Sequence, residues 1–187
     1  VLTLFLSFLW MNPPKYILVL ATFGVIYQLI ALVKLHRILI GIKSTIATNL
    51  TPFLYQLLKF VYLLFIIKII LQFLSDIPYF STLISQIIDF VIGYLHLVFL
   101  GLVSLSLLLF LAYFKLIKLS EIWVKMYLIG FIVSEILIFY KGFCNWQQLS
   151  IFDTYYLTLV LVSGFIPISL FGILFQNIVK KRSLIKK

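Results

Sequence analysis

The stretch Phe90–Phe114, with the sequence FVIGYLHLVFLGLVSLSLLLFLAYF, decides the fold class of this chain. Its only strongly polar side chain is His96, which lies between two glycines, Gly93 and Gly101. A helix needs about 20 apolar residues to cross the hydrocarbon core of a bilayer, and this stretch is longer. We therefore predict a membrane-spanning helix here. The histidine and the two helix-weakening glycines require a separate explanation.

Four further apolar runs have the length of a membrane span. The 187 residues are 64% hydrophobic and 11% charged, whereas a soluble domain is about half apolar and about a quarter charged. One small core cannot remove so much apolar surface from water, so the solvent must be lipid. The runs are continuous and do not alternate, which disfavours a β-barrel. We predict an all-α, polytopic membrane protein with about five transmembrane helices, at residues 16–33, 53–74, 90–114, 122–140 and 155–179.

The two ends of the chain lie outside this transmembrane helical domain, which we place at residues 15–179. Residues 1–14 are apolar, but they are too few to span a bilayer and they stop at Asn12-Pro13-Pro14. We interpret them as an interfacial segment or a truncated helix. Residues 180–187 form a basic tail, predicted to lie on the matrix side.

Basic residues gather on one side of the predicted spans. The other side holds Lys15 and Lys141, together with Asp76, Asp89 and Asp153. The positive-inside rule places the basic side, and the C-terminus, in the cytoplasm or matrix. The net charge of +10 does not indicate nucleic-acid binding, because the lysines lie between apolar runs and form no stripe on a soluble face. The residues of the basic side are Lys34, Arg37, Lys43, Lys115, Lys118, Lys125, Lys180, Lys181, Arg182, Lys186 and Lys187.

The sequence predicts no catalytic, cofactor-binding or metal site. His36 and His96 lie in different segments, and Cys144, the only cysteine, is far from both. The sequence has no phosphate-binding glycine loop, no nucleophile elbow and no paired carboxylates at a helical spacing. We expect a chain that is not an enzyme by itself and has no soluble substrate.

Three ionisable groups lie well inside predicted spans: Lys68, His96 and Glu135. Measured from the outer ends of their helices, they reach similar depths of roughly 9–12 Å at 1.5 Å per residue. A charge at the bilayer centre costs about 2.5–3.5 kcal/mol, so these groups must be paired or hydrated inside a bundle. We favour the pair Lys68–Glu135, with His96 as the next candidate partner. A proton-handling cluster and a structural polar patch, or contacts to partner subunits, both remain open.

The last predicted span begins with Thr154-Tyr155-Tyr156 and continues through Gly164-Phe165-Ile166 to Gly172-Ile173-Leu174. These groups resemble the start, middle and end of the terminal helix in the NADH dehydrogenase subunit 6 family of respiratory complex I, with one residue missing between the last two. Pro167 departs from the family pattern and would kink the helix.

The third predicted span resembles the third helix of the same family through Phe90, Gly93 and Gly101, with one inserted residue and with Phe90 in the place of a tyrosine. In the family, this helix carries a π-bulge beside its glycine, which reverts to α-helix as the complex changes state. We therefore predict a π-type or otherwise widened turn between Phe90 and Val98, because glycine tolerates such a turn. A close helix–helix contact is the alternative role for Gly93.

Asn49, Pro52 and Asp76 resemble two further family features, an Asn-Pro at the start of the second helix and an acidic residue after it, with two residues inserted after the asparagine. The resemblance implies a membrane-arm subunit of the proton-translocating NADH:ubiquinone oxidoreductase of the mitochondrial inner membrane. Its third helix would contribute to coupling quinone reduction to proton transfer. The partners would be other membrane subunits and lipid. The chain would bind no cofactor directly, since NADH, FMN, iron–sulfur clusters and ubiquinone belong to the parent complex.

A competing resemblance involves Asp76–Gln86 and the later stretch at residues 112–119, which are similar to the C-terminal part of complex I subunit 2. There Gln86 stands in the place of the family's proton-carrying lysine, and the last span stays unexplained. Abundant Phe, Ile, Tyr and Lys with little Ala is typical of an AT-rich organellar genome. Another organelle-encoded respiratory or ATP synthase subunit, and a non-catalytic structural or assembly membrane protein, are the remaining alternatives.

Overall fold

A computed structural model describes the backbone of residues 15–185 and the side chains of residues 19–179 apart from Ala21. Within these residues the chain is all-α, without strands, and five of its helices are long and apolar enough to cross a membrane. The predicted fold class is therefore confirmed. Residues 1–14 and the side chains of the basic tail at 180–187 lie outside the described part, so their interpretation stays a prediction.

Short connections join the helical segments. The third span has three parts, two α-helices with a π-helix, η2, between them, and the last span has two parts. In chain order the segments are α1 Lys15–Gly41, α2 Lys43–Asn49, α3 Pro52–Asp76, α4 Pro78–Gln86, α5 Ile88–His96, η2 Leu97–Ser104, α6 Leu105–Tyr113, α7 Glu121–Gln147, α8 Tyr155–Ser163 and α9 Phe165–Ile185.

Two helices run further than the apolar pattern predicts. α1 continues past Val33 to Gly41, and α7 continues past Tyr140 to Gln147. The extra turns carry polar and basic residues, so hydropathy alone ends the span too early. Long basic side chains such as Lys34 can extend along a helix towards the aqueous interface, which allows the helix to continue through them.

The last span is divided at Gly164, between α8 and α9. Pro167 has no N–H group and cannot bond the carbonyl of Ser163, four residues earlier. The division therefore corresponds to the kink predicted at this proline. α9 then continues to Ile185, so the predicted tail at residues 180–187 begins as helix.

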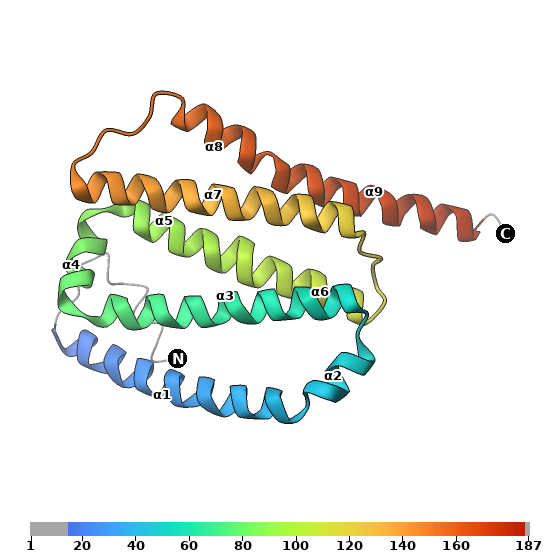
Figure 1. The fold of residues 1–187 in the computed structure, drawn as a ribbon, viewed down its shortest axis with the longest axis horizontal. Helices are drawn as coiled ribbons and strands as arrows, with labels where there is room; N and C mark the ends of the chain where they lie inside the picture. Colours follow the sequence, from blue (N-terminus) through green and yellow to red (C-terminus); the bar gives the residue numbers. More distant parts are fainter. Residues whose placement is uncertain (1–14, 186–187) are drawn as a thin grey trace.

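The spans lie side by side in the order α1, α3, the third span, α7 and α8–α9 (Figure 1). The third span crosses between its two neighbours. Its first part, α5, packs against α7, whereas η2 and α6 pack mainly against α3. The π-helix thus lies where the third span changes from one neighbour to the other.

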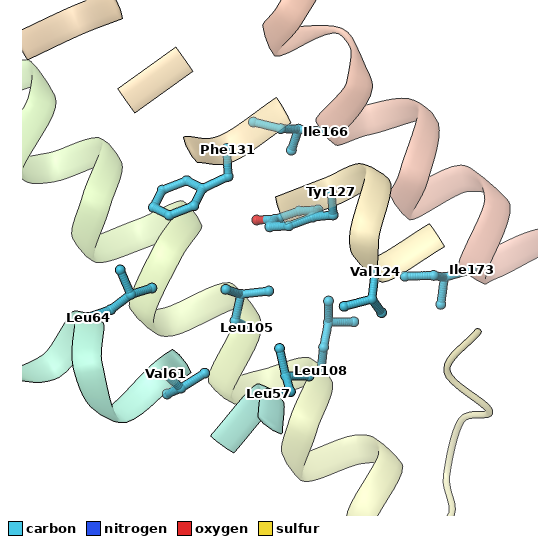
Figure 2. Close-up of a cluster of buried hydrophobic side chains, with 10 residues drawn as sticks. All are labelled: Leu57, Val61, Leu64, Leu105, Leu108, Val124, Tyr127, Phe131, Ile166 and Ile173. Carbon is cyan, nitrogen blue, oxygen red and sulfur yellow. The ribbon is translucent and has the colours of Figure 1, made fainter. Parts of the chain in front are cut away.

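The densest packing lies where α3, the third span, α7 and α9 meet. Figure 2 shows Tyr127 and Phe131 of α7 pointing towards the third span, where Leu105 is completely buried. Side chains on the opposite faces, such as Phe171 at 71% exposure, are also apolar, as expected for surfaces that face lipid or other subunits. The buried cluster consists of Leu57, Val61, Leu64, Leu105, Leu108, Val124, Tyr127, Phe131, Ile166 and Ile173.

Charged residues separate to the two ends of the bundle (Figure 1). α2 and the α6–α7 connection, with Lys43, Lys115 and Lys118, define one end, which we call the basic end. α4 and the α7–α8 connection, with Asp76 and Asp153, define the acidic end. This arrangement agrees with the charge asymmetry that five spans predict, and the positive-inside rule predicts that the basic end faces the cytoplasm or matrix.

Single-cysteine labelling tests this arrangement. In a Cys144→Ser background, Gln86→Cys at the acidic end and Lys118→Cys at the basic end should react with a membrane-impermeant maleimide from opposite sides, because both positions are exposed. Reaction of both cysteines from the same side would contradict the five-span arrangement. Reaction of Lys118→Cys from the outer side alone would reverse the predicted orientation.

Candidate functional site in the third span

The third span widens into a π-helix over Leu97–Ser104. The sequence predicts this kind of distortion, but between Phe90 and Val98. Residues 88–96 instead form regular α-helix, and the widened segment surrounds Gly101 and not Gly93. The predicted type of distortion is present, and its predicted position is too early in the chain.

Side chains supply hydrogen bonds to the carbonyls of this π-helix. A step of five residues would direct the N–H of Leu105 to the carbonyl of Leu100, but this N–H bonds the carbonyl of Leu102 instead. The hydroxyl of Tyr127 donates to the Leu100 carbonyl at 2.8 Å. The hydroxyl of Ser104 donates to the Phe99 carbonyl, also at 2.8 Å. In hydrocarbon no water can replace these donors, so they stabilise the widened turn.

Gly101 lets the neighbouring helices approach the π-helix. A Cβ atom at this position would lie 2.5 Å from Cζ of Phe131 and 3.1 Å from Cδ1 of Leu64. The Phe131 side chain is 1% exposed and has little room to move aside. Glycine is therefore required by packing at this point, independently of backbone flexibility.

Gly93 has the alternative role that the sequence analysis left open, a close helix–helix contact. A Cβ atom there would lie 3.1 Å from Phe139 and 3.3 Å from Ile138, both on α7. Phe90, one turn earlier, packs across Gly142 of α7, where a Cβ atom would lie 3.0 Å from its ring. These contacts hold α5 on α7, so Phe90 and Gly93 belong to an anchor and not to the widened turn.

An ion pair joins α5 to α7 beside the π-helix. Nδ1 of His96, the last residue of α5, lies 2.7 Å from Oε2 of Glu135. The two side chains are only 18% and 12% exposed. The other carboxylate oxygen, Oε1, is buried and has no hydrogen-bond partner among the described residues. Glu135 therefore has the polar partner that its depth in the membrane requires. Its Oε1 atom is a hydrogen-bond acceptor without a partner among the described residues.

The ring of Phe131 connects the ion pair with the π-helix. It stacks on the His96 ring, with centroids 6.0 Å apart and planes 11° apart, and it also covers Gly101. Tyr127, Phe131 and Glu135 follow one another at four-residue intervals, so they form one stripe of α7. The Phe131 ring is therefore in contact with both the π-helix and the His96–Glu135 pair.

Lys68 is not part of this cluster, and the favoured pair Lys68–Glu135 is wrong. Among the described residues, the Lys68 side chain makes no hydrogen bond and no ion pair. The reason lies in the helix order: the third span lies between α3 and α7 (Figure 1). Equal depth in the membrane therefore does not bring Lys68 and Glu135 together, and His96 on the intervening helix takes the carboxylate.

A second polar group fixes the acidic end of the third span. Asp89 is 6% exposed, and its two carboxylate oxygens accept hydrogen bonds from Asn145 Nδ2 at 2.6 Å and from Lys141 Nζ at 3.0 Å. All three residues lie at the ends of α5 and α7. This group and the His96–Glu135 pair together hold both ends of α5 against α7.

Asp76, the candidate acidic position of the family, ends α3 and lies apart from the π-helix. Its Oδ1 accepts a hydrogen bond from Thr22 of α1 at 3.1 Å. It therefore links the first two spans at the acidic end, and the structure gives it no contact with the candidate site.

Three residues of the site are absent from the sequence-based prediction: Ser104, Tyr127 and Phe131. Tyr127 and Phe131 could have been found from the sequence, because they precede Glu135 at four-residue intervals and so share its face of α7. No pattern in the sequence identifies Ser104, because serine in a membrane helix commonly bonds its own backbone.

The described residues contain no group of three or more His, Cys, Asp or Glu side chains able to hold a metal ion. His96 and Glu135 are the acid–base side chains of the site, and one carboxylate oxygen of Glu135 has no hydrogen-bond partner among the described residues. Comparison of the chain with models of known protein families, with curated proteins and with solved structures gives no match.

Replacing Tyr127 by Phe tests the support of the π-helix. The change removes the donor to the Leu100 carbonyl, and we expect the free energy of unfolding in detergent to fall by about 1–2 kcal/mol. Tyr155→Phe is the matched control, because Tyr155 is equally buried and its hydroxyl bonds the carbonyl of Leu137 within regular α-helix. Equal losses in the two variants would contradict a special role for Tyr127.

A double-mutant cycle tests the ion pair. His96→Leu leaves the Glu135 carboxylate buried without its partner, so the free energy of unfolding should fall by about 3–5 kcal/mol. Adding Glu135→Leu should recover much of this loss. Lys125→Leu breaks the exposed pair with Glu121 and serves as the control, with an expected change below about 0.5 kcal/mol. Additive effects of the two leucine substitutions would show that the pair is not coupled.

Proposed function

We infer that this chain is a membrane-arm subunit of a proton-translocating NADH:ubiquinone oxidoreductase in the mitochondrial inner membrane, similar to subunit 6. The observation that carries the proposal is the π-helix at Leu97–Ser104, in the middle of the third span and around a glycine. The resemblance described above implies a π-bulge beside Gly93 in the third of five spans. The π-helix agrees with it in kind and in span but surrounds Gly101, while Gly93 lies in regular α-helix. The number of spans, five, also supports the proposal.

In the proposed mechanism, η2 converts between π-helix and α-helix. Such a conversion shifts the register by one residue, which rotates one part of the span relative to the other by about 100° and moves it by about 1.5 Å. α5 is tied to α7 by His96 and Asp89, so α6 is the part that moves. The rotation would take Leu105 and Leu108 out of their buried positions against α3, so the two states differ in packing.

The His96–Glu135 pair responds to this conversion in the proposal. The register shift removes Leu100 from the Tyr127 hydroxyl and Gly101 from the Phe131 ring. Because that ring stacks on His96, its movement changes the surroundings of the imidazole and its carboxylate partner. A titratable pair whose surroundings depend on helix geometry can exchange protons in one state and hold them in the other. NADH, FMN, iron–sulfur clusters and ubiquinone would be bound by other subunits.

A non-catalytic structural or assembly protein is the main alternative class. Blue-native electrophoresis with an in-gel NADH dehydrogenase stain separates the two, because a membrane-arm subunit must comigrate with that activity. Comigration with cytochrome oxidase or ATP synthase activity, or with no respiratory complex, would reject the proposal.

Gly101→Ala tests the proposed role of the π-helix within the assembled complex. The added methyl group meets the buried Phe131 ring, and overpacking of this kind costs about 1–3 kcal/mol, which should bias the span towards one state. We expect the complex to assemble while NADH-driven proton pumping falls severalfold, and Phe131→Leu should restore part of it. Gly41→Ala, where a Cβ atom meets open space, is the control. Unchanged pumping in Gly101→Ala would contradict the mechanism.

A further inference from the structure

Lys68 of α3 is a cation inside the membrane without a counter-ion in the described part of the chain. It makes no hydrogen bond and no ion pair there. Its side chain is only partly exposed, and it lies eight residues, or about 12 Å, from the acidic end of the helix at Asp76. An ammonium group at this depth is costly unless an opposite charge neutralises it.

The chain has five acidic residues, all of them within the described part, and none of them pairs with Lys68. Four have partners of their own. The fifth, Asp153, is exposed in the α7–α8 connection, beyond the ends of the spans. The counter-ion of Lys68 must therefore come from another molecule. The four partnered acids form the pairs Asp76–Thr22, Asp89–Lys141, Glu121–Lys125 and Glu135–His96.

Lys68 belongs to the face of α3 that packs on the third span. It follows Leu57, Val61 and Leu64 at intervals of four, three and four residues, and those three side chains are buried. One turn later, Gln72 lines a cavity of about 390 Å³, where α5 leans away from α3 towards α7 (Figure 1). Lys68 thus lies where the two spans begin to separate, which leaves a position of the buried stripe accessible to another chain.

The direction of α3 keeps Lys68 away from lipid headgroups. Side chains on a helix tilt towards its N-terminus, which for α3 is the basic end. Lys59, about 11 Å from that end, uses this tilt, because its Nζ lies 4.4 Å from the ring centroid of Tyr55, one turn nearer the interface. The same tilt directs Lys68 away from the nearer, acidic interface. A carboxylate at the depth of Lys68 therefore fits better than an interfacial phosphate.

We propose that the face of α3 around Lys68 docks a transmembrane helix of another polypeptide, which carries an Asp or Glu at the depth of Lys68. The carboxylate accepts a charge-assisted hydrogen bond from Nζ, so each ion neutralises the other in hydrocarbon. The inference does not depend on which complex the chain joins, so it stands or falls separately from the proposed respiratory function.

Lys68→Met separates a partner in another polypeptide from a role within the chain. The unfolding midpoint of the purified full chain in detergent should stay the same or rise, because no partner within the chain is lost. On blue-native gels of native membranes, the amount of chain in its assembly should fall about tenfold, because the partner's carboxylate is left unpaired. Lys68→Arg keeps the charge and should assemble. Lys59→Met, at a similar depth from the opposite end, is the matched control and should assemble fully.

A membrane-permeant carbodiimide identifies the counter-ion. Dicyclohexylcarbodiimide activates a carboxyl group, and a neighbouring amine then displaces the urea and forms an amide without a spacer. Mass spectrometry of the treated membranes should find Lys68 joined to an Asp or Glu in an apolar segment of a different polypeptide. Lys68→Glu combined with a lysine at that acidic position should restore the assembly that either change alone prevents.

Four results would overturn the proposal. Full assembly of Lys68→Met would show that no partner needs the charge. A lower unfolding midpoint of the purified Lys68→Met chain would show a role within the chain, and crosslinking of Lys68 to one of the chain's own acidic residues would show an internal counter-ion. Loss of a bound phospholipid from the Lys68→Met assembly, with unchanged subunit content, would assign the ammonium to a lipid phosphate.

Discussion

A backbone carbonyl inside a membrane must have a donor from the protein, and the Leu100 carbonyl obtains it from Tyr127. The widened turn around Gly101 depends on this hydrogen bond, together with the one that Ser104 makes to Phe99. Glycine at position 101 then allows the Phe131 ring to close over the turn. The same ring stacks on His96, so one stripe of α7 both stabilises the π-helix and surrounds the ion pair.

The crossing of the third span links the candidate site with the cavity at the acidic end. α5 is held on α7 by Asp89 and His96, and this separates it from α3 near the acidic end. The gap that results is the cavity lined by Gln72 and Tyr94. After the π-helix, α6 packs against α3 and completes the buried cluster around Leu105. A change of register in η2 would therefore alter the packing of the basic half while the acidic half stays anchored.

The sequence predicts the fold through a strong and simple effect, the cost of exposing long apolar runs to water. The positions of the five spans follow from it. Their ends do not, because α1 and α7 continue through turns with basic and polar residues that hydropathy scores as loop. The division of the last span is predicted correctly from Pro167, since a missing N–H acts locally.

The candidate site is only partly predictable. Depth along a helix follows from counting residues, and the contact between His96 and Glu135 agrees with the similar depths predicted for these two residues. Contact between two such side chains also depends on the order of the helices and on the face of the helix that carries each residue. Counting residues gives neither, and the third span separates Lys68 from Glu135. Glycine content predicts a widened turn, but two glycines are available, and the donors of Tyr127 and Ser104 decide in favour of Gly101.

The central claim is that the third span has two states, distinguished by the hydrogen bond from Tyr127 to Leu100. High-resolution cryo-electron microscopy of the proposed respiratory complex at rest and during turnover measures it most directly. The account predicts one class of particles with the π-helix at Leu97–Ser104 and the 2.8 Å bond, and a second class with continuous α-helix in which the bond is lost. The same helix geometry and the same bond in every class would contradict it.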